Sequence, residues 1–166
     1  MPKADKFVPL KEIVGEANVV EDPDRLKAFT IDGKKPKAIV FPNTIHEVSK
    51  IVSYANQQQL TIVPRGNGTK MGVGGIPKKM DILLSTNRLN RITDNDCENL
   101  PLSVESGITL NEVQKSLASV GKGYFLPLDP SFTDKATLGG IIATNASGPK
   151  RLLYGIDKAC RHINHY

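Results

Sequence analysis

Two glycine-bearing segments in a fixed order restrict this chain more than any other feature. The first covers residues 64–69, with glycines at 66 and 68, and the second covers residues 137–148. Glycine has no Cβ, so it permits positive φ angles and leaves main-chain N–H groups uncovered. Such N–H groups are the donors that a pyrophosphate needs. Together the segments predict a site where bare backbone meets a flat, anionic ligand such as a dinucleotide.

The first segment does not match the better-known phosphate loops. A Walker loop ends in glycine, lysine and then serine or threonine, whereas here Lys70 follows the threonine. A Rossmann fingerprint needs a third glycine that opens a helix, but Met71 stands there, and the glycines and proline of residues 72–77 disfavour a helix. Triphosphate hydrolysis and classical NAD binding are therefore disfavoured. Taken alone, the segment fits a plain glycine turn equally well, and Arg65 would face either the phosphates or the outer surface.

The second segment adds a predicted helix start. Thr137 can begin a helix, whose N-terminus attracts a phosphate. Only small or polar side chains follow over residues 143–147, so a flat ligand could lie against the backbone. The alternative for this segment is close packing of a helix on a strand, which also requires glycines.

Strands and capped helices alternate along the chain. We expect strands at residues 38–41, 60–63, 82–85 and 102–105, the first two joined by a helix and running parallel. Each of the two predicted helices begins at a capping box, which is a threonine followed three residues later by a glutamate: Thr44 with Glu47, and Thr109 with Glu112. The first glycine segment follows the end of the second strand, where ligands of α/β sheets bind.

Composition excludes several functions. The chain has 166 residues, 39% of them hydrophobic, which suits one ordinary domain. Its net charge of +5 comes from scattered lysines, and aromatic residues are only 5% of the chain with no tryptophan, so nucleic-acid binding is disfavoured. Neither a signal peptide nor a transmembrane run is visible, and two cysteines form no disulfide framework. We therefore expect a cytoplasmic protein.

No catalytic constellation or metal site is visible. Cys160, His162 and His165 lack a fourth ligand, so no metal is expected there. His46 is expected to face solvent near the start of the first capped helix. Catalytic residues therefore stay unknown at this stage.

Four spaced motifs resemble the FAD-binding domain of the vanillyl-alcohol oxidase (PCMH) type. Within that superfamily the chain most resembles the FAD-binding subunit of bacterial glycolate oxidase, a relative of FAD-linked D-lactate dehydrogenases. The resemblance covers about residues 36–155, and the motifs that carry it lie at residues 63–70, 125–130, 136–149 and 151–155.

The resemblance implies an α+β fold of two subdomains with FAD held between them. It divides the chain into a helical lead-in at residues 1–35, a first FAD subdomain at 36–96 and an incomplete second one at 97–166. Pro64 would stiffen the first loop. The resemblance assigns the pyrophosphate contacts to Arg65, Gly66, Asn67, Gly68 and Thr69. It assigns the remaining cofactor contacts to Thr137, Gly139, Gly140, Ala143, Ser147, Gly148, Tyr154 and Gly155.

The resemblance further implies a subunit of an oxidoreductase that acts on a 2-hydroxy acid such as glycolate or D-lactate. Its partners would be a second flavoprotein subunit and an iron-sulphur subunit, and attachment to the inner membrane through such partner subunits is the alternative to a purely cytoplasmic location. Because residues 64–69 contain no histidine, FAD should be non-covalent. The family pattern continues beyond the length of this chain, so we expect a truncated product. The alternatives are a catalytically silent assembly module without flavin and, with little support, a basic nucleic-acid-binding domain.

Overall fold

The computed structural model describes residues 6–95, 102–121 and 123–154, and its contacts divide the chain into two compact units. The first unit is Met1–Arg65 with Met71–Leu89, and the second is Gly66–Lys70 with Asn90–Tyr166. This grouping differs from the predicted division at residues 35 and 96, because the N-terminal segment pairs with the first sheet and the glycine loop packs in the second unit. The division into domains stays a prediction.

The first unit is built on a four-stranded sheet of order β1-β2-β4-β3, in which β2, β4 and β3 are parallel and β1 is antiparallel to β2. Its strands are β1 (Val19–Val20), β2 (Ala38–Val40), β3 (Ile62–Arg65) and β4 (Ile82–Ser85). The parallel direction predicted for the first two strands is confirmed, although β4 lies between them. The two-residue strand β1 was not predicted, because so short a run shows no alternation.

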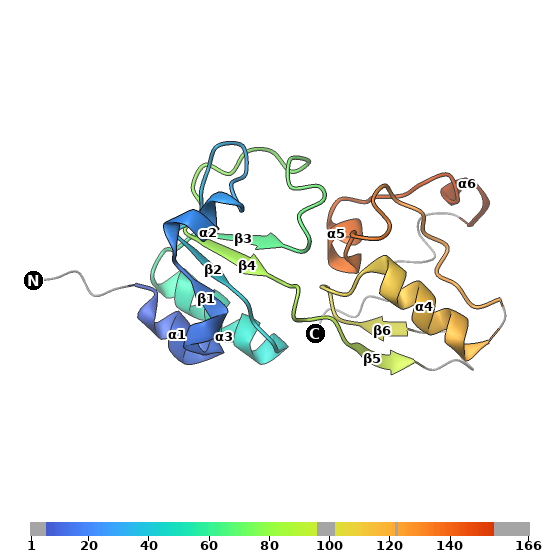
Figure 1. Ribbon diagram of the computed structural model, residues 1–166, viewed down its shortest axis with the longest axis horizontal. Helices are drawn as coiled ribbons and strands as arrows, with labels where there is room; N and C mark the ends of the chain where they lie inside the picture. The colour runs from blue at the N-terminus through green and yellow to red at the C-terminus, as the bar shows by residue number, and fades with distance from the viewer. Residues whose placement is uncertain (1–5, 96–101, 122, 155–166) are drawn as a thin grey trace, which may run out of the picture. The chain divides into compact units, whose positions relative to one another are not determined.

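Helices cover both faces of this sheet, as Figure 1 shows. They are α1 (Val8–Val14), the short 3₁₀ helix η1 (Glu16–Asn18), α2 (Pro23–Lys27) and α3 (Ile45–Gln57). Side chains of α1 and α3 form one core with Val40, Ile82 and Leu84. Ile39 and Leu83 point to the other core, which α2 covers through Leu26. Both faces of β2 and β4 are therefore buried, which explains why residues 38–40 and 82–84 are all apolar.

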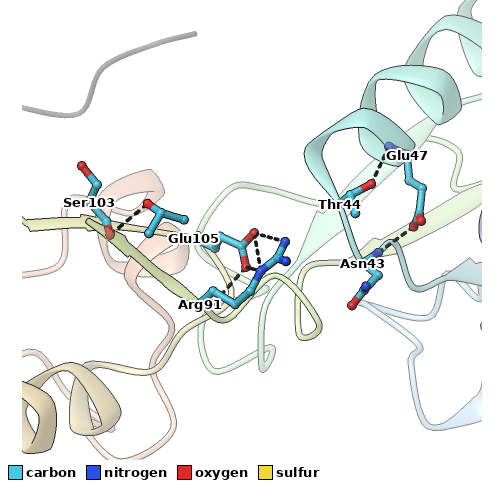
Figure 2. A network of polar contacts seen from close by, with 7 residues as sticks. Asn43, Thr44, Glu47, Arg91, Ser103 and Glu105 are labelled. Carbon is cyan, nitrogen blue, oxygen red and sulfur yellow. Dashed lines mark hydrogen bonds and ion pairs between the residues drawn. The ribbon is translucent and has the colours of Figure 1, made fainter. Parts of the chain in front are cut away.

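Both predicted helix caps are present, with different partners for the glutamate. In α3 the Thr44 hydroxyl accepts from Glu47 N at 3.1 Å, while the Glu47 carboxylate accepts from Asn43 N at 2.7 Å rather than from the cap residue (Figure 2). In the second helix, α4 (Leu110–Val120), Thr109 and Glu112 form the full reciprocal box. Hydrogen bonds from Thr109 lower the pKa of Glu112.

The described residues of the second unit form a two-stranded antiparallel sheet and three helices, which Figure 1 labels. The strands are β5 (Ile92–Asn95), which was not predicted, and β6 (Leu102–Val104); the other helices are α5 (Leu138–Ala143) and α6 (Arg151–Tyr154). Its core gathers Leu110 and Val113 of α4 with Leu138 and Ile141 of α5. Arg91 lies just before β5, and its guanidinium donates hydrogen bonds to the carboxylate of the buried Glu105 (Figure 2). This interaction lowers the pKa of the Glu105 carboxyl.

Within the described ranges, no helix is long and apolar enough to cross a membrane. No group of three or more histidine, cysteine, aspartate or glutamate side chains among those residues could hold a metal ion. Cys160, His162 and His165 lie outside the described residues.

Candidate functional site

The first glycine segment begins on the sheet of the first unit. Pro64 and Arg65 are the last residues of β3, and Arg65 lies opposite Ser85 of β4. The Arg65 guanidinium lies 4.6 Å from the centre of the Phe29 ring, and burial lowers its pKa. A stacked, partly desolvated guanidinium is suited to hold an anion. The choice between phosphates and outer surface for this side chain stays open.

The rest of that segment packs within the second unit, against the residues that lead into α5. Asn67 Nδ2 donates a hydrogen bond to the Lys135 carbonyl at 2.9 Å. Gly66 lies so close to Thr137 that a Cβ on it would overlap the threonine side chain. Gly68 has φ +74°, a conformation that L side chains rarely adopt. The fold thus brings the two glycine segments, about 70 residues apart in sequence, into contact.

Thr137 is the N-cap of α5, as predicted, but the amides that follow it already have acceptors. Leu138 N donates to Ile108 O and Gly139 N donates to Ser106 O, both at 2.9 Å. Gly140 N donates to the Thr137 hydroxyl at 3.3 Å. These three amides are therefore not open donors in this structure, because the helix is docked on the loop before α4. The packing alternative explains Gly139, since a Cβ there would lie 2.8 Å from Ser106 O.

Other amides of the two segments lack such acceptors. Among the described residues, none accepts a hydrogen bond from the main-chain N–H of Gly66, Gly68, Thr69, Ser147 or Gly148. Donors of this kind, on loops with little side-chain cover, are what a pyrophosphate requires. The residues present therefore fit an anionic dinucleotide.

The end of the second segment is held by one aspartate. Asn145, at φ +46°, ends α5, and the chain then passes Ser147 and Gly148. Both carboxylate oxygens of Asp129 accept from Lys150 N, at 3.1 and 3.2 Å. Gly148 lies against Asp129 so tightly that a Cβ would overlap its main-chain carbonyl. Asp129 thus fixes the path of the chain into α6.

The remaining predicted site residues lie at the surface of this unit. Ala143 is exposed on α5, and Tyr154 on α6 is half exposed. The Tyr154 ring meets Phe125 edge-on, with 5.6 Å between the ring centres. Gly155 lies outside the described residues.

Sequence reasoning missed three residues that shape this site: Ser106, Asp129 and Lys135. Ser106 and Lys135 contribute main-chain carbonyls, which every residue type has, so the sequence cannot reveal them. Asp129 was within one of the quoted motifs, but its partner is a main-chain N–H 21 residues away. The only signal for this role of Asp129 in the sequence was the presence of an acidic residue between two prolines.

Comparison with known proteins decides the family. A sequence model described as FAD binding domain matches residues 36–163. The chain belongs to the FAD binding domain family. The cofactor of that family is FAD, and the cofactor and the family named from the four motifs are confirmed.

Alignments with related proteins cover most of this chain but only a small part of each relative. A probable mitochondrial D-2-hydroxyglutarate dehydrogenase of Oryza sativa subsp. indica is 33% identical over 157 residues, which is 92% of this chain and 28% of the relative. The glycolate oxidase subunit GlcD of Bacillus subtilis (strain 168) is 33% identical over 123 residues, 74% of this chain and 26% of the relative. The chain therefore spans less than a third of these proteins.

Solved structures show the same fold. Alkyldihydroxyacetonephosphate synthase matches 90% of this chain and 33% of its own with a TM-score of 0.79 at 24% identity. p-Cresol methylhydroxylase matches 84% of this chain and 28% of its own with a TM-score of 0.66 at 19% identity. The α+β, PCMH-type fold predicted from the sequence is confirmed. The chain is an FAD-binding domain related to glycolate oxidase and to D-2-hydroxyglutarate and D-lactate dehydrogenases.

Proposed function

We propose that this chain is the FAD-binding part of a flavin-dependent oxidoreductase that oxidises a 2-hydroxy acid of the glycolate, D-lactate or D-2-hydroxyglutarate class. The observation that carries the proposal is the first loop, where Gly68 has a positive φ and the amides of Gly66, Gly68 and Thr69 have no described acceptor. The names of the relatives support the substrate class.

The proposed cofactor contacts follow from the two segments. The first loop would hold the pyrophosphate through its main-chain amides, with Arg65 adding positive charge at its start. The amides of Ser147 and Gly148 would add donors from the second segment. Three further residues would shape the site rather than contact the cofactor, because their contacts are with other protein residues: Thr137, Gly139 and Gly140. Pro64, Asn67, Ala143, Tyr154 and Gly155 complete the proposed set of residues that contact the cofactor or shape its site.

FAD, when bound, supplies the acceptor for the hydride equivalent of a 2-hydroxy acid. The part played by the described residues is to bind and orient the cofactor, and we assign no acid, base or carboxylate-binding side chain among them. Residues 64–69 contain no histidine, so the proposed FAD is non-covalent. We propose a second flavoprotein subunit and an iron-sulphur subunit as partners; the relative named as a glycolate oxidase subunit supports only assembly with other subunits.

Titration of FAD into the purified chain tests the cofactor assignment. Binding should shift the visible absorption of the flavin and raise the midpoint of thermal unfolding. When free FAD is 100 times its Kd, the free energy of unfolding should increase by about 2.7 kcal/mol. Gly68→Val should abolish binding, because a side chain at positive φ strains the loop and covers its amides. A chain that leaves the FAD spectrum and its own unfolding unchanged would refute the proposal.

Gly121→Val serves as the matched control. Gly121 lies in the same unit with extended backbone at φ 172°, and a Cβ there meets only the Tyr124 ring at 3.4 Å. This variant should keep the wild-type affinity for FAD. Equal loss of binding in both variants would mean that the effect of Gly68→Val is general destabilisation.

Anaerobic addition of substrate to the FAD-loaded chain tests the reaction. D-Lactate, D-2-hydroxyglutarate and glycolate are compared with L-lactate, and bleaching of the visible flavin band reports reduction. Bleaching by the D-acids or glycolate supports the proposed activity. Bound FAD that none of them reduces would restrict this chain to the cofactor-holding role.

A further inference from the structure

The side chain of Asn67 is engaged with the protein rather than left open on the loop. Its Nδ2 donates to the main-chain carbonyl of Lys135 at 2.9 Å, across 68 residues of sequence. The residue itself is exposed, so little apolar burial holds it in place. This hydrogen bond is a specific tie between the first loop and the segment before α5.

The acceptor carbonyl belongs to a tightly bonded turn. The main-chain N–H groups of Lys135 and Ala136 both donate to Phe132 O, at 2.9 and 2.8 Å. Ala136 is buried in the core of the second unit, and the next residue, Thr137, is the buried cap of α5. A carbonyl fixed in this way offers Asn67 an acceptor whose position is set by the core.

A second contact lies beside the first. Gly66 packs directly against the Thr137 side chain, in the absence of any Cβ. Two neighbouring loop residues thus contact the same short segment before α5: Gly66 packs against Thr137, and Asn67 donates a hydrogen bond to Lys135. The amides of Gly68 and Thr69, which have no described acceptor, follow directly.

We propose that Asn67 is a positioning residue: it holds the loop amides in their binding arrangement before the cofactor arrives. The inference rests on the proposed FAD site. A loop ordered in advance does not lose conformational freedom on binding, so its affinity is higher. The role differs from direct contact with the pyrophosphate, because it acts on the free protein as well.

Two substitutions remove the tie. Asn67→Asp keeps the shape of the side chain but has no N–H to donate, and Asn67→Ala removes the group. Lys135→Ala is the matched control, because it changes the side chain and leaves the accepting carbonyl in place. Both positions are exposed, so the fold should survive in all three variants, and far-ultraviolet circular dichroism checks this.

The decisive measurement is made without FAD. Backbone order parameters of Gly68 and Thr69 should fall from about 0.85, typical of rigid backbone, to below about 0.6 in both Asn67 variants. The FAD dissociation constants of both Asn67 variants should rise about tenfold, because the hydrogen bond is lost and binding must then order the loop. Lys135→Ala should change the order parameters little and the affinity by at most about twofold.

Three results would overturn the positioning role. An unchanged loop in the free Asn67 variants together with weaker FAD binding would show that Asn67 contacts the cofactor directly. Unchanged affinity in both variants would show that the tie has no part in binding. A Lys135→Ala effect as large as that of Asn67→Ala would show that the loss does not come from the hydrogen bond to the Lys135 carbonyl, which this variant keeps. A wild-type chain that does not bind FAD refutes the proposed function instead, and the order parameters still report the tie.

Discussion

Gly139→Ala tests whether the second glycine segment exists for packing. A Cβ on Gly139 would lie 2.8 Å from both the Cβ and the main-chain oxygen of Ser106. Carbon atoms pack at about 3.5–4.0 Å, so the start of α5 would have to move away by roughly 1 Å. The oxygen belongs to the backbone and cannot rotate out of the way.

The expected loss of stability follows from three contributions. Overpacking of this kind costs about 1–3 kcal/mol. The movement also stretches the 2.9 Å hydrogen bond from Gly139 N to Ser106 O, whose loss costs about 1 kcal/mol. Alanine in a helix regains up to about 1 kcal/mol over glycine. The second unit should therefore lose about 1–3 kcal/mol.

Gly140→Ala is the control in the adjacent position of the same helix. A Cβ there meets only the Thr137 hydroxyl, at 3.1 Å, and gains the same helix propensity. Its stability should stay within about 1 kcal/mol of wild type. Urea unfolding gives the free energies, and hydrogen exchange at the Leu138 amide, bonded to Ile108 O, reports on the second unit alone. A Gly139→Ala variant as stable as Gly140→Ala would refute the packing explanation.

Three further predictions concern stability. Burial alone would raise the pKa of Asp81, but Lys37 and Lys79 at 2.8 and 2.7 Å outweigh it and lower the pKa from 3.8 to about 2. The pairing therefore stabilises the first unit above pH 4 and is lost as pH falls from about 4 to about 2. Both ammonium groups are more than half exposed, so about 1–2 kcal/mol should disappear over that range, and Asp81→Asn should flatten the acid limb of an unfolding curve. Gln59→Gly should stabilise the first unit by about 0.5–1 kcal/mol in urea unfolding, because Gln59 has φ +54° after α3, and a loss of stability would contradict this. Phe132→Asn should raise the thermal midpoint of the second unit slightly, because Phe132 is 62% exposed at φ +62°, and a lower midpoint would show that its ring is needed.

Short-range patterns predicted the elements well where local chemistry decides them. The Ile82–Ser85 strand and the Leu110–Val120 helix lie where alternation and capping placed them. β3 begins two residues later than predicted, at Ile62, because its bounds follow pairing with β4. Val19–Val20 became a strand only through its pairing with β2. Pairing depends on a partner distant in sequence, which a local pattern does not contain.

The sequence by itself determined the family and its cofactor, because the order and spacing of the glycine motifs are properties of the chain. Tertiary structure decided what each glycine does. Gly68 needs its left-handed φ, whereas Gly66, Gly139 and Gly148 are confined by Thr137, Ser106 and Asp129. The absence of a Cβ permits both a left-handed φ and close packing. Only the positions of atoms that are distant along the chain show which of the two a given glycine provides. For the same reason the acceptors of the Leu138 and Gly139 amides and of the Asn67 side chain are main-chain carbonyls that only the folded chain brings into place.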